Sequence, residues 1–112
     1  MKAISVKQPW ASLIACGKKM IETRTWYTNY RGDILIASSR LPKVGTLPLG
    51  YALCIARLHD CRKMTKADEV EACCEMYTGA YAWVFSDIFP IKPFGVKGKL
   101  GIYEVSEKTT LI

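Results

Sequence analysis

The chain has 112 residues, half of them hydrophobic, which is enough for one compact domain with one core. No apolar run approaches the roughly 18–20 residues that cross a bilayer, and residues 1–6 resemble a first strand more than a signal peptide. We therefore expect a single domain over residues 1–112, intracellular and cytoplasmic, with no membrane partner. The sequence leaves the oligomeric state open.

The formal net charge is +6, and it is distributed unevenly along the chain. Residues 1–50 hold eight Lys and Arg against only Glu22 and Asp33, whereas residues 51–112 hold eight against eight. Because neutralisation of phosphates by Lys and Arg drives sequence-independent affinity for nucleic acids, this excess indicates a polyanionic partner. A merely solvated surface is the alternative explanation.

The five cysteines match neither a disulfide framework nor a zinc site. Their number is odd, Cys54 and Cys61 are too far apart for a close ligand pair, Cys73 and Cys74 are adjacent, and His59 is the only histidine. The sequence therefore predicts reduced thiols, no metal and no cofactor.

The first part of the chain predicts a strand, a short helix and a second strand. After a strand over residues 3–6, Pro9 suits the first turn of a helix, and Gly17 fits the left-handed position just past its end. Residues 20–26 alternate as a strand does, and the short apolar run in 33–38 fits a buried strand.

The second part predicts further strands around one more helix. Thr65 can cap a helix whose first turn is acidic and which ends near residues 76–79. The remaining predicted elements are a loop over 40–50, strands over 51–58, 81–85 and 99–105, and a proline-bounded loop over 87–97. The pattern indicates an α+β or mainly β fold, a mainly antiparallel barrel of about six strands with two short helices.

Two adjoining stretches carry most of the candidate chemistry. Lys7 and Gln8 lie at the junction of the first strand and helix, where free N–H groups attract anions, although Gln8 can simply cap the helix and Trp10 more simply anchors it in the core. In the second strand Glu22 and Arg24 share one face with Trp26. If that face lines a cleft, Arg24 can bind phosphate and Trp26 can stack on a base; if it faces solvent, the charges form an ordinary surface pair.

The order of these stretches and their residue sequences resemble the ASCH domain, a family related in fold to the PUA RNA-binding domain. The segment Gln8-Pro9-Trp10 resembles the family's opening helix, and Gly17, Lys19, Glu22 and Arg24 match its G-x-K-x-x-E-x-R motif. The strand Ala80 to Phe85 and the segment Pro93 to Val105 resemble its last strands, so the resemblance covers nearly the whole chain. It implies a PUA-like mixed β-barrel with a cleft, lined by the motif, between barrel and helices.

The resemblance implies two kinds of function. Family members bind RNA or DNA, and some small bacterial members hydrolyse N4-acetylcytidine or cut RNA. In the amidohydrolase branch a lysine, a threonine and a glutamate act together; the lysine falls on Lys19, but Glu22 occupies the threonine position. We expect a nucleic-acid-binding module, with RNA favoured over DNA. A small amidohydrolase or ribonuclease acting on modified cytidine nucleosides or RNA is the alternative, with Lys19 and Glu22 as its catalytic residues.

The predicted ligand is thus RNA, DNA or a nucleoside-like small molecule, held in a basic, aromatic-lined cleft. The residues expected to line this cleft are cationic, polar or aromatic: Lys7, Gln8, Lys18, Lys19, Glu22, Arg24, Trp26, Tyr30, Arg31, Trp83 and Lys97.

Overall fold

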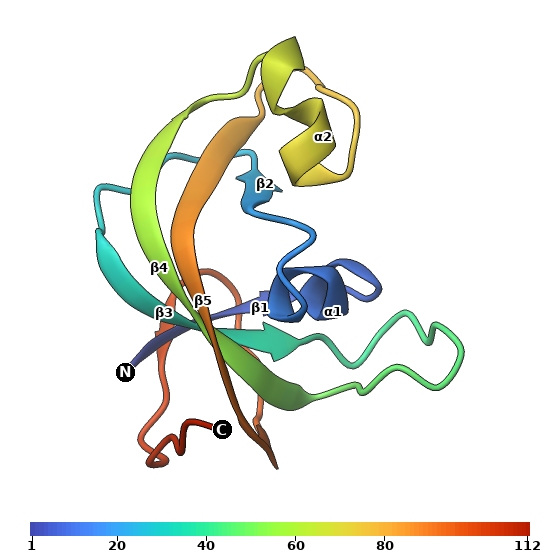
Figure 1. The fold of residues 1–112 in the computed structure, drawn as a ribbon, viewed down its shortest axis with the longest axis vertical. Coiled ribbons are helices and arrows are strands. Elements are labelled where there is room, and N and C mark those ends of the chain that lie inside the picture. The colour runs from blue at the N-terminus through green and yellow to red at the C-terminus, as the bar shows by residue number, and fades with distance from the viewer.

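The computed structural model describes all 112 residues as a strongly curved six-stranded sheet with short helices packed beside it (Figure 1). The elements in chain order are β1 (Lys2–Val6), α1 (Trp10–Ala15), β2 (Ile21–Arg24), β3 (Gly32–Ser38), β4 (Tyr51–Lys63), the 3-10 turn η1 (Lys66–Asp68), α2 (Glu69–Ala72), β5 (Tyr81–Gly95) and β6 (Tyr103–Glu104).

The strands pair in the order β2-β5-β4-β3-β1-β6. β1 runs parallel to β3, and every other neighbouring pair is antiparallel. The predicted mixed α+β class is confirmed. The barrel is incomplete, because β2 and β6 at the two ends of the sheet each pair with a single neighbour and the ladder does not close.

The two longest strands give the sheet its curvature. β4 has 13 residues and β5 has 15, and their register shifts three times along the pair. Such irregularities add twist and bend to a ladder, and Figure 1 shows both strands sweeping from the end of the molecule that carries α2 to the opposite end.

The predicted loop over residues 87–97 is wrong for most of its length, because β5 continues to Gly95 through Pro90 and Pro93. Proline lacks an N–H and is tolerated in a strand only where the ladder does not need that donor. β2 pairs with residues 81–84 of β5 alone, so the second edge of β5 beyond Val84 carries no named strand. Beyond Val84 this edge meets only the isolated bridge between Ile91 and Leu111, whose hydrogen bonds use the Lys92 N–H and the Pro90 carbonyl, so neither proline is needed there as a donor.

Three other boundaries also differ from the sequence prediction. The strand predicted over 51–58 continues as β4 to Lys63. The last strand shrinks from 99–105 to Tyr103–Glu104, and α2 ends at Ala72 because Cys73 turns the chain with a left-handed φ of 55°. The predicted start of the helical segment is confirmed, since Thr65 precedes η1 and its N–H donates to Asp68 Oδ2 at 2.8 Å.

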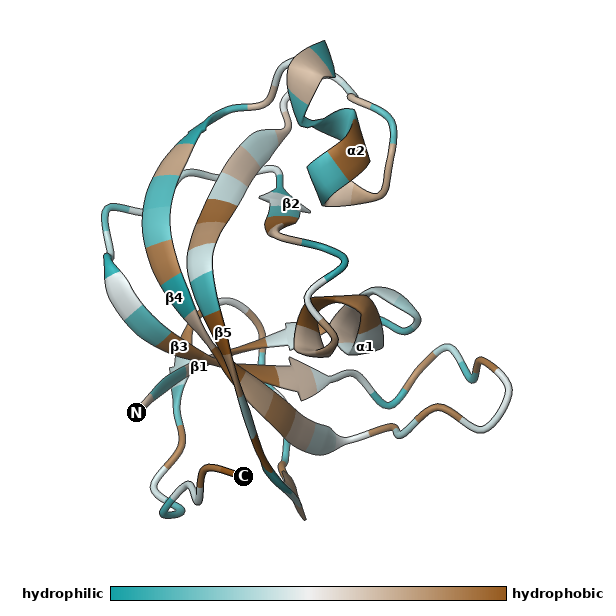
Figure 2. Cartoon of the chain, in the orientation of Figure 1, coloured by the Kyte–Doolittle hydropathy of each residue, from teal (hydrophilic) through white to brown (hydrophobic).

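Apolar side chains fill both faces of the sheet. One cluster joins α1 to the sheet and contains Ile14, Trp83 and Phe85. A second cluster lies among β1, β3, β4 and the later part of the chain, and a third packs β2 and β5 against α2. Figure 2 shows the corresponding hydrophobic colouring on α1 and where the strands cross. None of the helices has the length and apolar character that a bilayer crossing requires.

Candidate nucleic-acid interface

The motif between residues 17 and 24 turns the chain from α1 into β2. Gly17 adopts a φ of +82°, as expected for the residue that ends a helix. The N–H groups of Lys18 and Lys19 both donate to the Leu13 carbonyl at 3.0 Å, which closes the turn. The side chain of Lys18 points to solvent, whereas that of Lys19 is buried.

Lys19 connects the motif to α2. Its side chain is 1% exposed, and Nζ donates to the carbonyl of Ala72, the last residue of α2. Nζ also lies 3.6 Å from Glu22 Oε1. A cation at a helix C-terminus is stabilised by the carbonyls that have no partner within the helix, so much of the hydrogen-bonding capacity of this amine is used within the fold.

Glu22 and Arg24 form a largely desolvated ion pair on β2. Arg24 Nη2 lies 3.1 Å from Glu22 Oε2 and donates to the Ser5 carbonyl at 2.7 Å, which ties β2 to β1 across the molecule. The Glu22 side chain is 9% exposed and that of Arg24 is 21% exposed. Arg24 Nε is buried without a hydrogen-bond partner. The pair therefore differs from an ordinary surface ion pair.

The motif faces a cavity of about 250 Å³ that we call the inner chamber. Two aromatic rings line it together with polar side chains. Trp10 comes from the start of α1 and Tyr77 from the segment after α2. Trp10 is 38% exposed and Tyr77 is 41% exposed, so both rings are open to a ligand. The lining residues are Val6, Lys7, Trp10, Lys19, Glu22, Thr23, Cys74 and Tyr77.

Two further cavities adjoin the inner chamber through shared lining residues. The middle chamber, about 310 Å³, shares Lys7, Glu22 and Thr23 with it and is completed by Ser5, Arg24, Ser39, Lys99, Leu100 and Gly101. The outer chamber, about 470 Å³, shares Ser5, Ser39, Lys99 and Leu100 with the middle one and adds Ser38, Arg40, Gly50, Val96, Lys97 and Gly98. We call the three adjoining chambers the groove.

The groove concentrates the positive charge of the chain. Six cationic side chains and one acid line it, which leaves ten cations and nine acids for the rest of the molecule. Five of the six net positive charges therefore belong to the groove. The cations are Lys7, Lys19, Arg24, Arg40, Lys97 and Lys99, and the acid is Glu22.

A sequence model of the ASCH domain matches residues 4–95, which include both the sheet and the motif. The chain belongs to the ASCH domain family. Its fold is similar to the crystal structure of ASCH from Zymomonas mobilis, with a TM-score of 0.72 and 17% sequence identity over 95% of this chain and 87% of that one. A tyrosine-to-phenylalanine mutant of the same protein gives a TM-score of 0.68 at 17% identity, covering 95% and 90% of the two chains.

Activating signal cointegrator 1 is similar over a shorter stretch. The Homo sapiens protein is 53% identical to this ASCH domain over 36 residues, and the Mus musculus protein is 50% identical over 36 residues. The matched stretch is 32% of this chain and 6% of each cointegrator. The chain thus corresponds to a small part of those proteins.

At the predicted anion site at the start of α1, two N–H groups already donate hydrogen bonds within the protein. Gln8 Oε1 accepts from the Ser12 N–H at 3.0 Å, while Gln8 Nε2 donates to Ser12 Oγ at 2.8 Å and to the Pro48 carbonyl at 2.9 Å. The Ala11 N–H is taken by the Lys7 carbonyl at 3.1 Å. The buried Gln8 therefore caps the helix, and only the exposed Lys7 of this junction lines the groove.

The two tryptophans expected to stack on a base lie outside the groove. Trp83 is completely buried in the core, where its Nε1 donates to the Trp26 carbonyl at 3.3 Å, so no face of its ring is open to a ligand. Trp26, just past the end of β2, is 37% exposed and meets Trp83 edge to face at 4.8 Å between centroids. It lines none of the three chambers.

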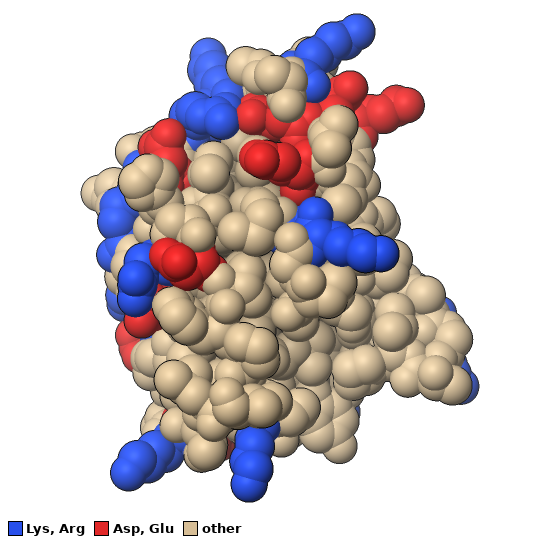
Figure 3. Space-filling view, in the orientation of Figure 1, with Lys and Arg blue, Asp and Glu red and all other residues tan.

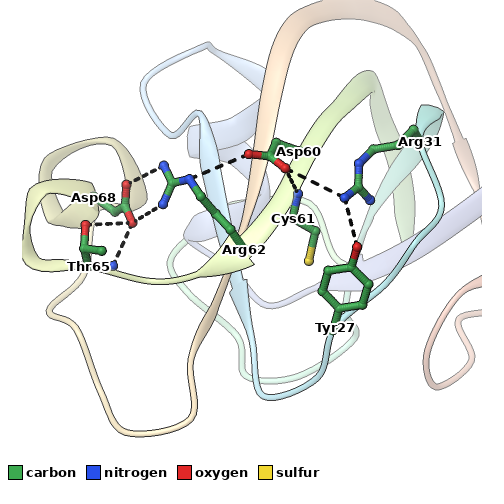
Figure 4. A network of polar contacts seen from close by, with 7 residues as sticks. All are labelled: Tyr27, Arg31, Asp60, Cys61, Arg62, Thr65 and Asp68. Atoms are coloured by element: carbon green, nitrogen blue, oxygen red, sulfur yellow. Dashed lines mark hydrogen bonds and ion pairs between the residues drawn. The ribbon is translucent and has the colours of Figure 1, made fainter.

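Tyr30 and Arg31 are also separate from the groove. The Tyr30 hydroxyl donates to the Asp33 carbonyl at 2.7 Å. Arg31 donates to the Thr28 carbonyl at 2.9 Å and belongs to a polar network on β4, in which it approaches Asp60 at 3.8 Å (Figure 4).

The same network fixes the start of the α2 region. Asp60 lies 3.7 Å from Arg62 Nε, and Arg62 makes a two-pronged contact with Asp68 at 2.8 and 2.9 Å (Figure 4). The hydrogen bond from Arg62, with a further one from the Thr65 N–H, lowers the pKa of the buried Asp68 from 3.8 to about 2. These charged contacts brace the strand β4 against the start of the α2 region.

Several lining residues are not among those that the sequence predicts for the cleft. The sequence favours a core position for Trp10 and gives no reason to place Tyr77 or Thr23 in the cleft, although Thr23 lies between two motif residues. Arg40 comes from a loop that carries no local binding pattern, and Lys99 lies two residues after the predicted Lys97 in an irregular segment. Their positive charge was the only available signal. Lys97, which was selected, lines the outer chamber.

Proposed function

We propose that this ASCH domain binds single-stranded nucleic acid, RNA in the first instance, in the groove. The observation that carries the proposal is the placement of five of the six net positive charges along three adjoining chambers. A cationic groove attracts the phosphate backbone, and unpaired bases can enter side pockets that a duplex would not reach. In contrast, acidic side chains gather near α2 on the face drawn in Figure 3, and the lower part of that face is largely uncharged.

The inner chamber is the part of the groove suited to a base. Trp10 and Tyr77 offer partly exposed aromatic rings, and stacking on such rings contributes about 1–3 kcal/mol per base. Glu22 is the only acid in the groove, and a carboxylate has about four lone-pair sites, of which Lys19 and Arg24 engage two. The remaining sites can accept a hydrogen bond from the exocyclic amine of cytosine or adenine.

Lys7 and Arg24 are placed to meet the phosphate attached to that nucleotide. Both line the middle chamber, and Lys7 also belongs to the inner one. Lys7 is exposed and takes part in no ion pair of the structure, so it can contact a phosphate without losing a protein partner. Arg24 is held by Glu22 and Ser5 and presents a fixed guanidinium.

Fluorescence anisotropy with a short labelled single-stranded RNA tests this proposal. We expect the logarithm of the affinity to fall linearly with the logarithm of the salt concentration, and Lys7→Gln to reduce the slope by about 0.7 because one phosphate contact is lost. Trp10→Ala should weaken binding at every salt concentration without changing the slope. Lys92→Gln is the matched control, since Lys92 is an exposed cation of β5 outside the groove.

Parallel titrations with DNA of the same sequence and with duplex RNA define the ligand class. Tighter binding of single strands than of the duplex is the expected result. Affinity that does not change with salt, or equal losses in the Lys7→Gln and Lys92→Gln variants, would contradict the proposal.

A second candidate function is hydrolysis of a modified cytidine nucleoside or of RNA. It is supported by the presence of Lys19, Glu22 and Thr23 in one chamber. Binding is favoured over hydrolysis because the Lys19 amine donates to the Ala72 carbonyl and Glu22 is paired on both sides. Incubation with N4-acetylcytidine and with single-stranded RNA separates the two candidates, since turnover that is lost in Glu22→Gln at unchanged folding supports the hydrolase.

A further inference from the structure

We propose that the outer chamber holds the sugar-phosphate backbone of the nucleotides next to the one in the inner chamber, so that the ligand is an oligonucleotide rather than a free nucleoside. This inference rests on the proposed function and extends it to a part of the groove that lies beyond the motif.

The chemistry of the outer chamber differs from that of the inner one. Its wall contains three cations, three serines and no acid, and it has no aromatic ring. Arg40, Lys97 and Lys99 are exposed and form none of the ion pairs of the structure. The hydroxyls of Ser5 and Ser38 are hydrogen-bonded to Tyr103 and Tyr51, so the three cations are the free polar groups of this wall. Unpaired cations suit phosphate oxygens, whereas a base needs the aromatic surface that only the inner chamber offers.

One wall of the outer chamber is fixed by a close contact between the backbone of Gly98 and the side chain of Ser5. A Cβ atom on Gly98 would lie 2.7 Å from Ser5 Oγ, which is itself hydrogen-bonded to the Tyr103 hydroxyl at 2.7 Å. Because Gly98 has no side chain, residues 97–99 can pack closely against β1. Lys97 and Lys99, on either side of Gly98, are therefore held at the chamber by the backbone between them.

The opposite wall is fixed in a similar way around Gly50, whose φ of +75° favours glycine. The Gly50 N–H donates to the Ser38 carbonyl at 2.9 Å, and its own carbonyl accepts from the Val96 N–H at 2.9 Å. The Arg40 side chain lies across this residue, with Cγ 3.4 Å from the position of a Cβ on Gly50. Arg40 and the lysine-bearing segment thus face one chamber from two directions.

The chambers also adjoin in the order that an oligonucleotide requires. Ser5, Ser39 and Lys99 belong to both the middle and the outer chambers, and Lys7 belongs to both the middle and the inner chambers. A strand with one base in the inner chamber can therefore place its next phosphate in the middle chamber and the following one in the outer chamber.

Calorimetric titration with cytidine 5′-monophosphate and with oligocytidylates from dinucleotide to tetranucleotide tests this inference. We expect the wild-type affinity to rise with each added nucleotide until the outer chamber is filled and then to level off. The double variant Arg40→Gln/Lys97→Gln removes the two cations that line the outer chamber alone. It should keep the mononucleotide affinity within twofold and lose most of the gain with length. Its salt slope for the tetranucleotide should fall by about 1.4, since about 0.7 is expected for each phosphate contact. Arg40 and Lys97 are both exposed, so melting curves should show an unchanged fold.

The outcomes separate this inference from the proposed function. Lys92→Gln is the charge control and should follow the wild type at every length. If the mononucleotide binds and depends on Trp10 but longer ligands bind no better, the outer chamber is not a backbone site and the proposed function stands. Sodium tripolyphosphate carries phosphates but no base. If it competes for the protein as well as the trinucleotide does, the claim that one strand occupies both the base site and the backbone site is overturned. If neither nucleotide nor oligonucleotide binds, both proposals fail.

Discussion

Replacing Asp68 by Asn should lower the free energy of unfolding at neutral pH. It should also remove part of the loss of stability that the wild type shows as the pH becomes acidic. Asp68 accepts two hydrogen bonds from Arg62 and one from the Thr65 N–H, and these contacts hold the pKa of its carboxyl at about 2 instead of 3.8. At about 1.36 kcal/mol per pKa unit this lowering corresponds to roughly 2 kcal/mol of unfolding free energy. Because the Arg62 side chain is 43% exposed, solvent screening reduces the expected value to about 1–2 kcal/mol.

The direction of the pH effect follows from the lowered pKa. The folded state binds this proton less readily than the unfolded state, so the contribution is fully present above about pH 5. It is lost as the pH falls through 3.8, the ordinary value, toward the folded value of about 2. Wild type and Asp68→Asn should therefore differ in stability at neutral pH and converge at the acid end of that window.

Urea denaturation at a series of pH values measures this difference directly. Asp33→Asn is the matched control, since Asp33 pairs with Arg57 at 3.1 Å on the surface, where the two side chains are 47% and 50% exposed. Its effect should stay below about 1 kcal/mol, as for exposed pairs in general. A difference between wild type and Asp68→Asn that is constant from neutral pH to pH 2 would refute the reasoning, because a carboxyl with a shifted pKa must lose its contribution on protonation.

Two other predictions concern packing and thiol chemistry. Gly98→Ala should lower the melting temperature slightly, because the new methyl group meets Ser5 Oγ at 2.7 Å and the hydroxyl must rotate away from its hydrogen bond with Tyr103. In a Ser5→Ala background, which lacks this hydroxyl, the same substitution should have no further effect; equal melting curves for Gly98→Ala and wild type would contradict this cost. Burial raises the pKa of the Cys54 thiol to about 12. A thiol-specific reagent at mildly alkaline pH should therefore label the exposed Cys16 and Cys73 and modify Cys54 only after denaturation. Labelling of Cys54 in the folded protein, detected by mass spectrometry, would show that the strand opens.

Local rules of chain geometry predicted the parts of the site that depend on neighbouring residues. The left-handed Gly17 and the capping Thr65 were placed correctly because each acts within one helical turn of its partners. The period of two in a strand put Glu22 and Arg24 on the same face, where the structure pairs them at 3.1 Å. It could not decide between cleft and solvent, because that choice depends on which distant elements cover the face.

The roles of the tryptophans show the limit of that approach. Trp10 was assigned to the core and is 38% exposed in the groove, whereas Trp83 was considered for stacking and is completely buried. In a strand that is packed on both faces, alternation does not identify the face that a ligand can reach, and β5 contributes residues to all three hydrophobic clusters. Only the tertiary arrangement separates the two rings.

The outer chamber depends entirely on long-range packing. Arg40 and Lys97 are far apart in the sequence and meet because residues 39–50 and 96–101 are both tied to β1 and its neighbours. The sequence predicted the second of these segments partly as a strand and placed a proline-bounded loop before it. It therefore offered no reason to bring their charges together.

The contact between Lys19 and the end of α2 has a consequence for interpreting the family motif. A lysine and a glutamate separated by two residues in a cavity invite a catalytic explanation, yet here the amine also joins two secondary-structure elements, with a second link from the Met20 N–H to the Glu71 carbonyl at 2.9 Å. Selection for a stable fold alone can keep such a motif in a sequence. In this protein the lysine of the motif is therefore part of the architecture, and a catalytic role would require its amine to leave the Ala72 carbonyl.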